Sequence, residues 1–109
     1  LIAMNLPSLD KYEDATVSGG FIFIDSTLIG RKVERSDVKA FYIPATKMAN
    51  DAGIPTLANM IMMGKMIKET GLVRFDDVID TLKKIVSAKR ANLLDANIKA
   101  LEAGYNYAE

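Results

Sequence analysis

The most constraining feature of this sequence is a four-residue run, residues 21–24, that reads Phe-Ile-Phe-Ile. Every position in the run is β-branched or aromatic, so an extended strand would be apolar on both of its faces. Such a strand is typical of the middle of a sheet that is covered by helices on both sides. The run follows a glycine pair, Gly19-Gly20, and ends at polar residues 25–27. It therefore predicts a buried central strand.

Two further segments predict strands of the same sheet. Residues 1–4 read Leu-Ile-Ala-Met, and residues 38–43 form a strand-like run that ends at Pro44. Proline stops the hydrogen-bond ladder because it has no backbone N–H to donate. After the first strand, Asn5 is expected to cap a short helix that has Pro7 in its first turn.

The second half of the chain predicts helices that are bounded by glycine or proline. The expected helices span residues 46–52 before Gly53, residues 55–70 before Gly71, residues 76–86, and residues 87–103 before Gly104. Glycine commonly follows a helix because it adopts the left-handed conformation without strain. Strands alternating with such helices predict an α/β fold, here a three-layer α/β/α domain with a parallel or mixed sheet.

The chain starts in a strand-like run and has no initiator methionine. We therefore expect residues 1–109 to be the C-terminal part of a single domain that begins upstream. Removal of a tag, or disordered ends, would explain the same start. A chain of 109 residues has room for one core at most.

Composition limits the chemistry that this chain can perform. It has no cysteine, which excludes disulfides, thiolate zinc sites and cysteine-ligated iron–sulfur clusters, and it has no histidine, the usual general base near neutral pH. Any redox centre must then belong to another polypeptide. Fourteen basic and fourteen acidic side chains predict neither nucleic acid nor an anionic membrane as a partner. With no membrane-length apolar run and no signal peptide, a cytoplasmic protein is the default expectation.

Polar side chains follow each predicted strand. They are Asn5 after the first strand, Asp25-Ser26-Thr27 after the second, and Thr46 shortly after the third. Ligands of open α/β sheets bind at the carboxyl ends of the strands, so these groups are candidates for orienting a ligand or contacting a partner. The same residue types are also the ordinary residues of caps and turns, which is the alternative interpretation.

Residues 57–67 predict a helix that is apolar on nearly all sides, with Lys65, Lys68 and Glu69 as a solvated strip. Such a helix is buried on more than one side, in a core or in a subunit interface. Gly64 lies on the helix face that also carries Leu57, Met60 and Ile67. Because glycine inside a helix costs about 1 kcal/mol relative to alanine, we expect a close approach of a neighbouring element at Gly64.

Two charged clusters have simple interpretations. Asp76, Asp77 and Asp80 suit the positive N-terminal end of a helix better than they suit a metal site. The basic cluster of Lys83, Lys84, Lys89 and Arg90 predicts a solvated helix face, with a contact to phosphate or to acidic partner residues as the alternative. No metal-binding or catalytic residue is predicted.

Several stretches together resemble the gamma subunits of 2-oxoacid:ferredoxin oxidoreductases, the enzymes of pyruvate, 2-oxoglutarate and branched-chain 2-oxoacids. The resemblance covers nearly the whole chain and lies in Asn-Leu-Pro-Ser-Leu-Asp-Lys-Tyr at 5–12, the glycine pair with the strand at 19–26, Ile-Pro-Ala-Thr-Lys-Met-Ala at 43–49, Ala-Asn-Met-Ile-Met-Met-Gly at 58–64, and residues 97–105. Two departures stand out. The family's glycine-rich Gly-x-Gly-Gly-Gln-Gly segment is absent, and Met63-Gly64-Lys65 replaces the usual Leu-Gly-Ala.

The resemblance implies a division of labour within a complex that converts a 2-oxoacid to an acyl-CoA. Thiamine diphosphate, magnesium and iron–sulfur clusters belong to alpha, beta and ferredoxin-like delta partners, and none is expected in this chain. The gamma part is then a non-catalytic scaffold, with Asn5, Ser26 and Asn59 as candidates for lining a coenzyme A or subunit cleft. Whether the isolated chain forms a homo-oligomer stays open. A stand-alone nucleotide- or cofactor-binding α/β module and an unrelated interaction domain remain as alternatives.

Overall fold

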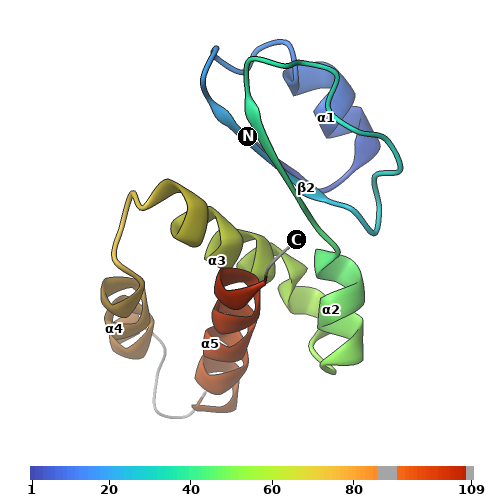
Figure 1. Cartoon of the computed structure of the whole chain (residues 1–109). Helices are drawn as coiled ribbons and strands as arrows, with labels where there is room; N and C mark the ends of the chain where they lie inside the picture. Colours follow the sequence, from blue (N-terminus) through green and yellow to red (C-terminus); the bar gives the residue numbers. More distant parts are fainter. Residues whose placement is uncertain (86–90, 108–109) are drawn as a thin grey trace.

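The computed structural model describes residues 1–85 and 91–107. The first half of the chain contains the three strands, with a helix between the first and second strands and an irregular segment between the second and third, and helices make up the second half (Figure 1). The elements in chain order are β1 (Ile2–Ala3), α1 (Leu6–Tyr12), β2 (Phe21–Asp25), β3 (Lys39–Ile43), α2 (Ala45–Asp51), the 3-10 turn η1 (Pro55–Leu57), α3 (Ala58–Thr70), α4 (Phe75–Ile85) and α5 (Ala91–Asn106). The fold is α/β, as the sequence predicts.

The three strands form one parallel sheet in the order β1-β2-β3. Phe23 of β2 is paired with Ile2 on one side and with Phe41 on the other. The β2 strand is therefore central, and four of its five residues are buried. The prediction that residues 21–24 form a buried central strand is confirmed.

The two faces of β2 pack against different layers. Phe23 points to a cluster that contains Ile43 of β3, Ala49 of α2, and Ile61 of α3. Ile22 and Ile24 point the other way, to a cluster with Leu9 of α1 and with Ile29. The stacked Phe21, Phe23 and Phe41 rings continue the first face, with the Phe23 and Phe41 centroids 5.2 Å apart. The alternation of β2 side chains thus divides the core into two halves, as expected in a three-layer arrangement.

Helix ends largely follow the predicted glycines. Gly71 has a left-handed φ of 62°, and its N–H donates to the Ile67 carbonyl to close α3. Gly53 follows the end of α2 with a φ of 72°. The expected single helix from Pro55 is instead a 3-10 turn followed by α3. The predicted extension of α4 to residue 86, and the predicted start of the last helix at residue 87, lie outside the described residues.

The predicted end of the last helix at Gly104 is wrong. Helix α5 continues to Asn106, and Gly104 is a buried residue inside it. Its missing side chain serves packing, because a Cβ atom there would lie 1.8 Å from the Ile61 carbonyl oxygen of α3. The close contact between α3 and α5 is visible in Figure 1 as two adjacent helices, yellow-green and red.

Candidate functional site

The polar residues that follow the three strands lie at one end of the sheet, where the carboxyl ends of the parallel strands meet. Asp25 ends β2 and is fully buried, and Thr46 lies in the first turn of α2, directly after β3. The Thr46 hydroxyl donates to Asp25 Oδ2 over 2.6 Å, and the Thr27 N–H donates to Asp25 Oδ1 over 3.1 Å. The predicted grouping of residues 25–27 with Thr46 is therefore present.

These polar groups cap helix α2. Pro44 occupies the N-cap position of α2 and provides no side-chain hydrogen bond to it. Instead the Thr46 N–H donates to Asp25 Oδ1 (3.4 Å) and the Lys47 N–H donates to Thr27 Oγ1 (3.1 Å). The first N–H groups of a helix need such acceptors because no turn precedes them. Asp25 and Thr27 thus have a structural role, as the capping interpretation holds.

The three candidates for cofactor contact occupy different environments. Asn5 caps α1, since its Oδ1 accepts from the Ser8 N–H over 2.9 Å. Ser26 is exposed and its backbone N–H donates to the Ile43 carbonyl. Asn59 is exposed in the first turn of α3. Asn5 and Ser26 follow neighbouring strands at the same edge, whereas no hydrogen bond within residues 1–85 and 91–107 joins Asn59 to either of them.

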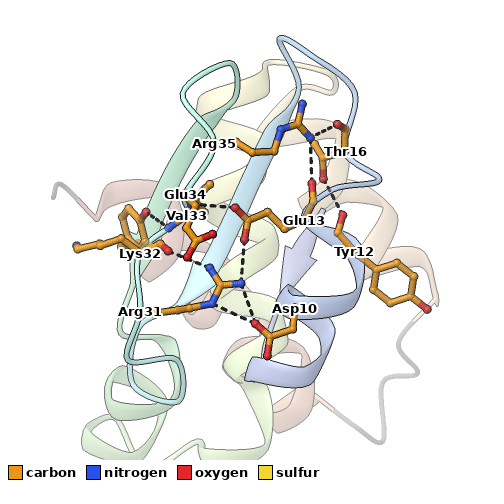
Figure 2. A network of polar contacts seen from close by, with 10 residues as sticks. Asp10, Tyr12, Glu13, Thr16, Arg31, Lys32, Val33, Glu34 and Arg35 are labelled. Carbon is orange, nitrogen blue, oxygen red and sulfur yellow. Dashed lines mark hydrogen bonds and ion pairs between the residues drawn. The ribbon is translucent and has the colours of Figure 1, made fainter.

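A second polar cluster lies over helix α1 and was not predicted (Figure 2). The Arg31 guanidinium contacts Asp10 Oδ1 and Glu13 Oε1, both at 2.8 Å, and the Glu34 N–H donates to Glu13 Oε2 over 2.8 Å. Arg35 donates to the Glu13 and Thr16 carbonyls. These bonds tie the polar segment after β2 to α1. The partners are about 20 residues apart in sequence, so no local pattern indicates them.

Glu13 is 5% exposed and titrates differently from a free glutamate. Burial by itself raises the pKa of its carboxyl group, but the Glu34 N–H and the Arg31 guanidinium outweigh that effect and hold the pKa below the ordinary value. The carboxylate is therefore charged near neutral pH, and its bonds to Arg31 and to the Glu34 N–H hold the polar segment after β2 against α1. Its role is structural.

The predicted solvated strip on α3 is partly wrong, because Lys65 is only 4% exposed. Its ammonium donates to Glu69 Oε1 (2.9 Å) and to the Tyr107 carbonyl (3.0 Å), and lies 5.5 Å from the Phe41 ring centroid. Two acceptors and an aromatic face make up for lost water. Lys68 is exposed, as predicted, and Glu69 is half-buried. Sequence reasoning missed the burial because Tyr107 is 42 residues away.

Two of the three aspartates of the predicted acidic cluster have the expected place at the start of a helix, whereas Asp80 lies further along α4. Asp76 and Asp77 lie in the first turn of α4, where negative charge complements the helix dipole. Within the described part of the chain, no three acidic side chains gather to hold a metal ion. Lys83 and Lys84 occupy the last turn of α4 and are exposed, whereas Lys89 and Arg90 lie outside the described residues. Among the described residues, no helix has the length and apolar character needed to cross a membrane.

Residues 1–107 match the sequence profile of the family described as pyruvate ferredoxin/flavodoxin oxidoreductase. The chain belongs to this family. The resemblance seen in the sequence motifs is thereby confirmed. The match covers the sheet and all the helices of the structure.

Relatives within this group agree with the assignment. A ketoisovalerate oxidoreductase subunit VorA of Methanothermobacter thermautotrophicus is 34% identical over 109 residues, which are 99% of this chain and 22% of that protein. A 2-oxoglutarate synthase subunit KorC of Methanocaldococcus jannaschii is 27% identical over 111 positions, covering 100% of this chain and 58% of that protein. The chain thus spans less than two thirds of either relative.

A solved structure has the same fold. The gamma subunit of a keto/oxoacid ferredoxin oxidoreductase from Geobacter sulfurreducens superposes with a TM-score of 0.83 at 24% identity. The superposition covers 96% of this chain and 60% of that subunit. The arrangement of three parallel strands and flanking helices is therefore a fold that an experimentally solved protein also adopts.

Proposed function

We propose that this chain is the C-terminal part of a gamma subunit or gamma domain in a complex that oxidatively decarboxylates a 2-oxoacid to an acyl-CoA. The observation that carries the proposal is the family match over residues 1–107, together with relatives named as subunits of ketoisovalerate oxidoreductase and 2-oxoglutarate synthase. The role proposed for the chain is that of a scaffold with no catalytic centre.

The residue types support this division of labour. Decarboxylation of a 2-oxoacid needs a carbanion sink, which thiamine diphosphate supplies and protein side chains do not. The chain has no cysteine for an iron–sulfur cluster and no histidine base, so its own residues do not fit the redox cofactor. We therefore assign thiamine diphosphate, magnesium and the clusters to alpha, beta and delta partners, and the complex to the cytoplasm.

Contact with coenzyme A is proposed for exposed polar residues that follow β1 and β2 and for one in the first turn of α3. Ser26 is exposed at the end of β2. The Oδ1 atom of Asn5 caps α1, and the side-chain NH2 group of Asn5 is the part that would donate to a ligand. With Asn59, they are offered as the lining of a coenzyme A or subunit cleft. Asp25 is left out because its carboxylate is buried and bonded to Thr46.

The sheet supports the proposal that more of the domain lies upstream or in a second chain. Strand β1 is an edge strand of two residues, and its Ile2 and the preceding Leu1 are 38% and 36% exposed. An unpaired edge next to apolar side chains is suited to receiving another strand. We expect such a strand to pair with β1 in the intact protein.

The test is affinity purification of the tagged native protein from its own cells under anaerobic conditions. We expect a polypeptide of greater intact mass than residues 1–109, held with partners that contain iron and thiamine diphosphate and that reduce a viologen dye with a 2-oxoacid and coenzyme A. Recovery of the protein alone, or with partners lacking both cofactors, would favour a stand-alone nucleotide-binding module instead.

A further inference from the structure

Two adjoining hollows lie where the C-terminal half of α3 meets the end of α5 and the start of α4. The first has a volume of about 460 Å³ and is lined by Phe41, Lys65 and Tyr107 among others. The second has a volume of about 450 Å³ and is lined by residues that include Val73 and Arg74. Lys68 and Tyr105 line both hollows. The two hollows therefore share a wall, and together they are called the Lys68 groove below.

The lining of the second hollow combines charged side chains with the apolar Ile67, Val73, Phe75 and Tyr105. Phe75 and Tyr105 pack with ring centroids 4.6 Å apart. Val73 is 51% exposed, and the preceding Leu72 is 78% exposed. Val73 lines the hollow and Leu72 adjoins it, so the exposed aliphatic side chains and the aromatic pair offer a partner a small apolar surface beside the charged one.

Only some of the charged side chains that line the groove are paired with one another. Lys65 is paired with Glu69, so these two charges balance each other. Lys68 and Arg74 are exposed, and neither forms an ion pair with a carboxylate in the described ranges 1–85 and 91–107. The Lys68 ammonium instead lies 5.0 Å from the Tyr105 ring centroid. Asp76 also lines the second hollow, but it lies in the first turn of α4, where it complements the helix dipole.

We propose that the Lys68 groove is a docking site for a segment of a partner subunit that carries an acidic side chain next to an apolar one. The carboxylate pairs with Lys68 and Arg74, and the apolar side chain covers Val73 and the Phe75–Tyr105 pair. Charge complementarity selects this occupant, because an apolar segment alone would leave both cations unpaired against it. The assignment rests on the proposed function, which supplies the partner subunit.

The first arm of the test is carbodiimide cross-linking of the purified native complex, followed by peptide mass spectrometry. Carbodiimide joins an amine to a carboxylate in direct contact, so we expect Lys68 to be joined to an aspartate or glutamate of a partner subunit. A complex in which Lys68 is joined only to residues of its own chain, or remains as open to amine labelling as in the isolated chain, would overturn the docking site.

The second arm compares charge-reversal variants. We expect Lys68→Glu combined with Arg74→Glu to weaken association with the partner subunits about tenfold, that is by about 1.4 kcal/mol. The matched control is Lys11→Glu combined with Lys32→Glu, two exposed lysines that also lie over tyrosine rings, at 5.2 and 4.0 Å. The control should assemble like the wild type, and both variants should show the wild-type circular dichroism spectrum and melting temperature.

The outcomes separate this inference from the function on which it rests. If the wild-type complex forms and both double variants assemble equally well, the groove is not the docking site while the proposed function stands. If the isolated chain self-associates and only the Lys68 variant abolishes that, the occupant is a second copy and the partner-subunit assignment is wrong. If no complex forms with the wild type, the proposed function and the docking site fail together.

Discussion

Gly64 of α3 and Gly104 of α5 lie in one helix crossing, each against a backbone carbonyl of the other helix. A Cβ atom added at Gly64 would lie 2.1 Å from the Leu101 carbonyl oxygen, and one added at Gly104 would lie 1.8 Å from that of Ile61. Protein Cβ atoms do not make contacts this short, so any larger residue must push the helices apart. The two glycines are what allows the helices to pack this closely.

We expect Gly64→Leu to lower the free energy of unfolding by about 1–3 kcal/mol or more, because the added side chain overpacks the crossing. Urea denaturation followed by circular dichroism measures the change. Gly30→Ala is the control, since a Cβ atom there meets no atom within 4 Å. Equal stability of Gly64→Leu and the wild type would place Gly64 on a solvent-facing surface, against the structure.

A feature of this fold can be predicted from the sequence when the residues that cause it are close together in the chain. Asn5 as a cap and Gly71 as a stop were predicted because a cap or stop acts within one turn. Gly104 was misassigned because a glycine that permits packing and a glycine that ends a helix look alike in sequence. The burial of Lys65 and the Arg31–Glu13 pair escaped prediction because their partners come close only in the folded chain.

The Asp25–Thr46 bond gives a second prediction. We expect Thr46→Val to destabilise the protein by about 1–3 kcal/mol, because the buried Asp25 carboxylate loses its 2.6 Å hydroxyl donor while the volume stays similar. Thr56→Val, at an exposed position of η1, is the matched control and should change stability by less than about 0.5 kcal/mol. Thermal and urea unfolding measure both. A Thr46 variant as stable as the control would show that Asp25 does not depend on this hydroxyl.

Glu13 gives a prediction for pH. Its pKa in the folded protein lies below the ordinary value of 4.5, so its contribution to stability is present above about pH 4.5 and is lost as the pH falls through the lower folded-state value. We expect Glu13→Gln to lower the free energy of unfolding by about 1 kcal/mol at pH 7, because it removes the charge that pairs with Arg31. The loss is no larger because Arg31 is partly open to solvent, which weakens the ion pair.

The measurement that tests the role of Glu13 is the pH dependence of the difference in unfolding free energy between the wild type and Glu13→Gln. The stability gap between the wild type and Glu13→Gln should narrow as the pH falls below 4.5, measured by urea denaturation at several pH values. A gap that stays constant over this range would mean that the Glu13 charge contributes nothing.

The proposed cleft predicts an effect on coenzyme A use in the assembled complex. We expect Ser26→Ala and Asn59→Ala to raise the KM for coenzyme A with little change in kcat, as expected when a binding contact is removed. Asn5→Ala should add a loss of about 1 kcal/mol of stability, because the α1 cap is lost, whereas Asn5→Asp keeps a capping oxygen. An unchanged KM for coenzyme A in the Ser26 and Asn59 variants would remove these residues from the site.

The central claim is that this chain is an assembly part without a catalytic centre. The most direct measurement is anaerobic reduction of a viologen dye by the pure chain with a 2-oxoacid, coenzyme A, thiamine diphosphate and magnesium, alongside calorimetric titration with the cofactor. We predict no dye reduction and no useful affinity for thiamine diphosphate until alpha, beta and cluster-bearing partners are added together. Turnover by the chain alone, or tight magnesium-dependent binding of thiamine diphosphate, would contradict the account.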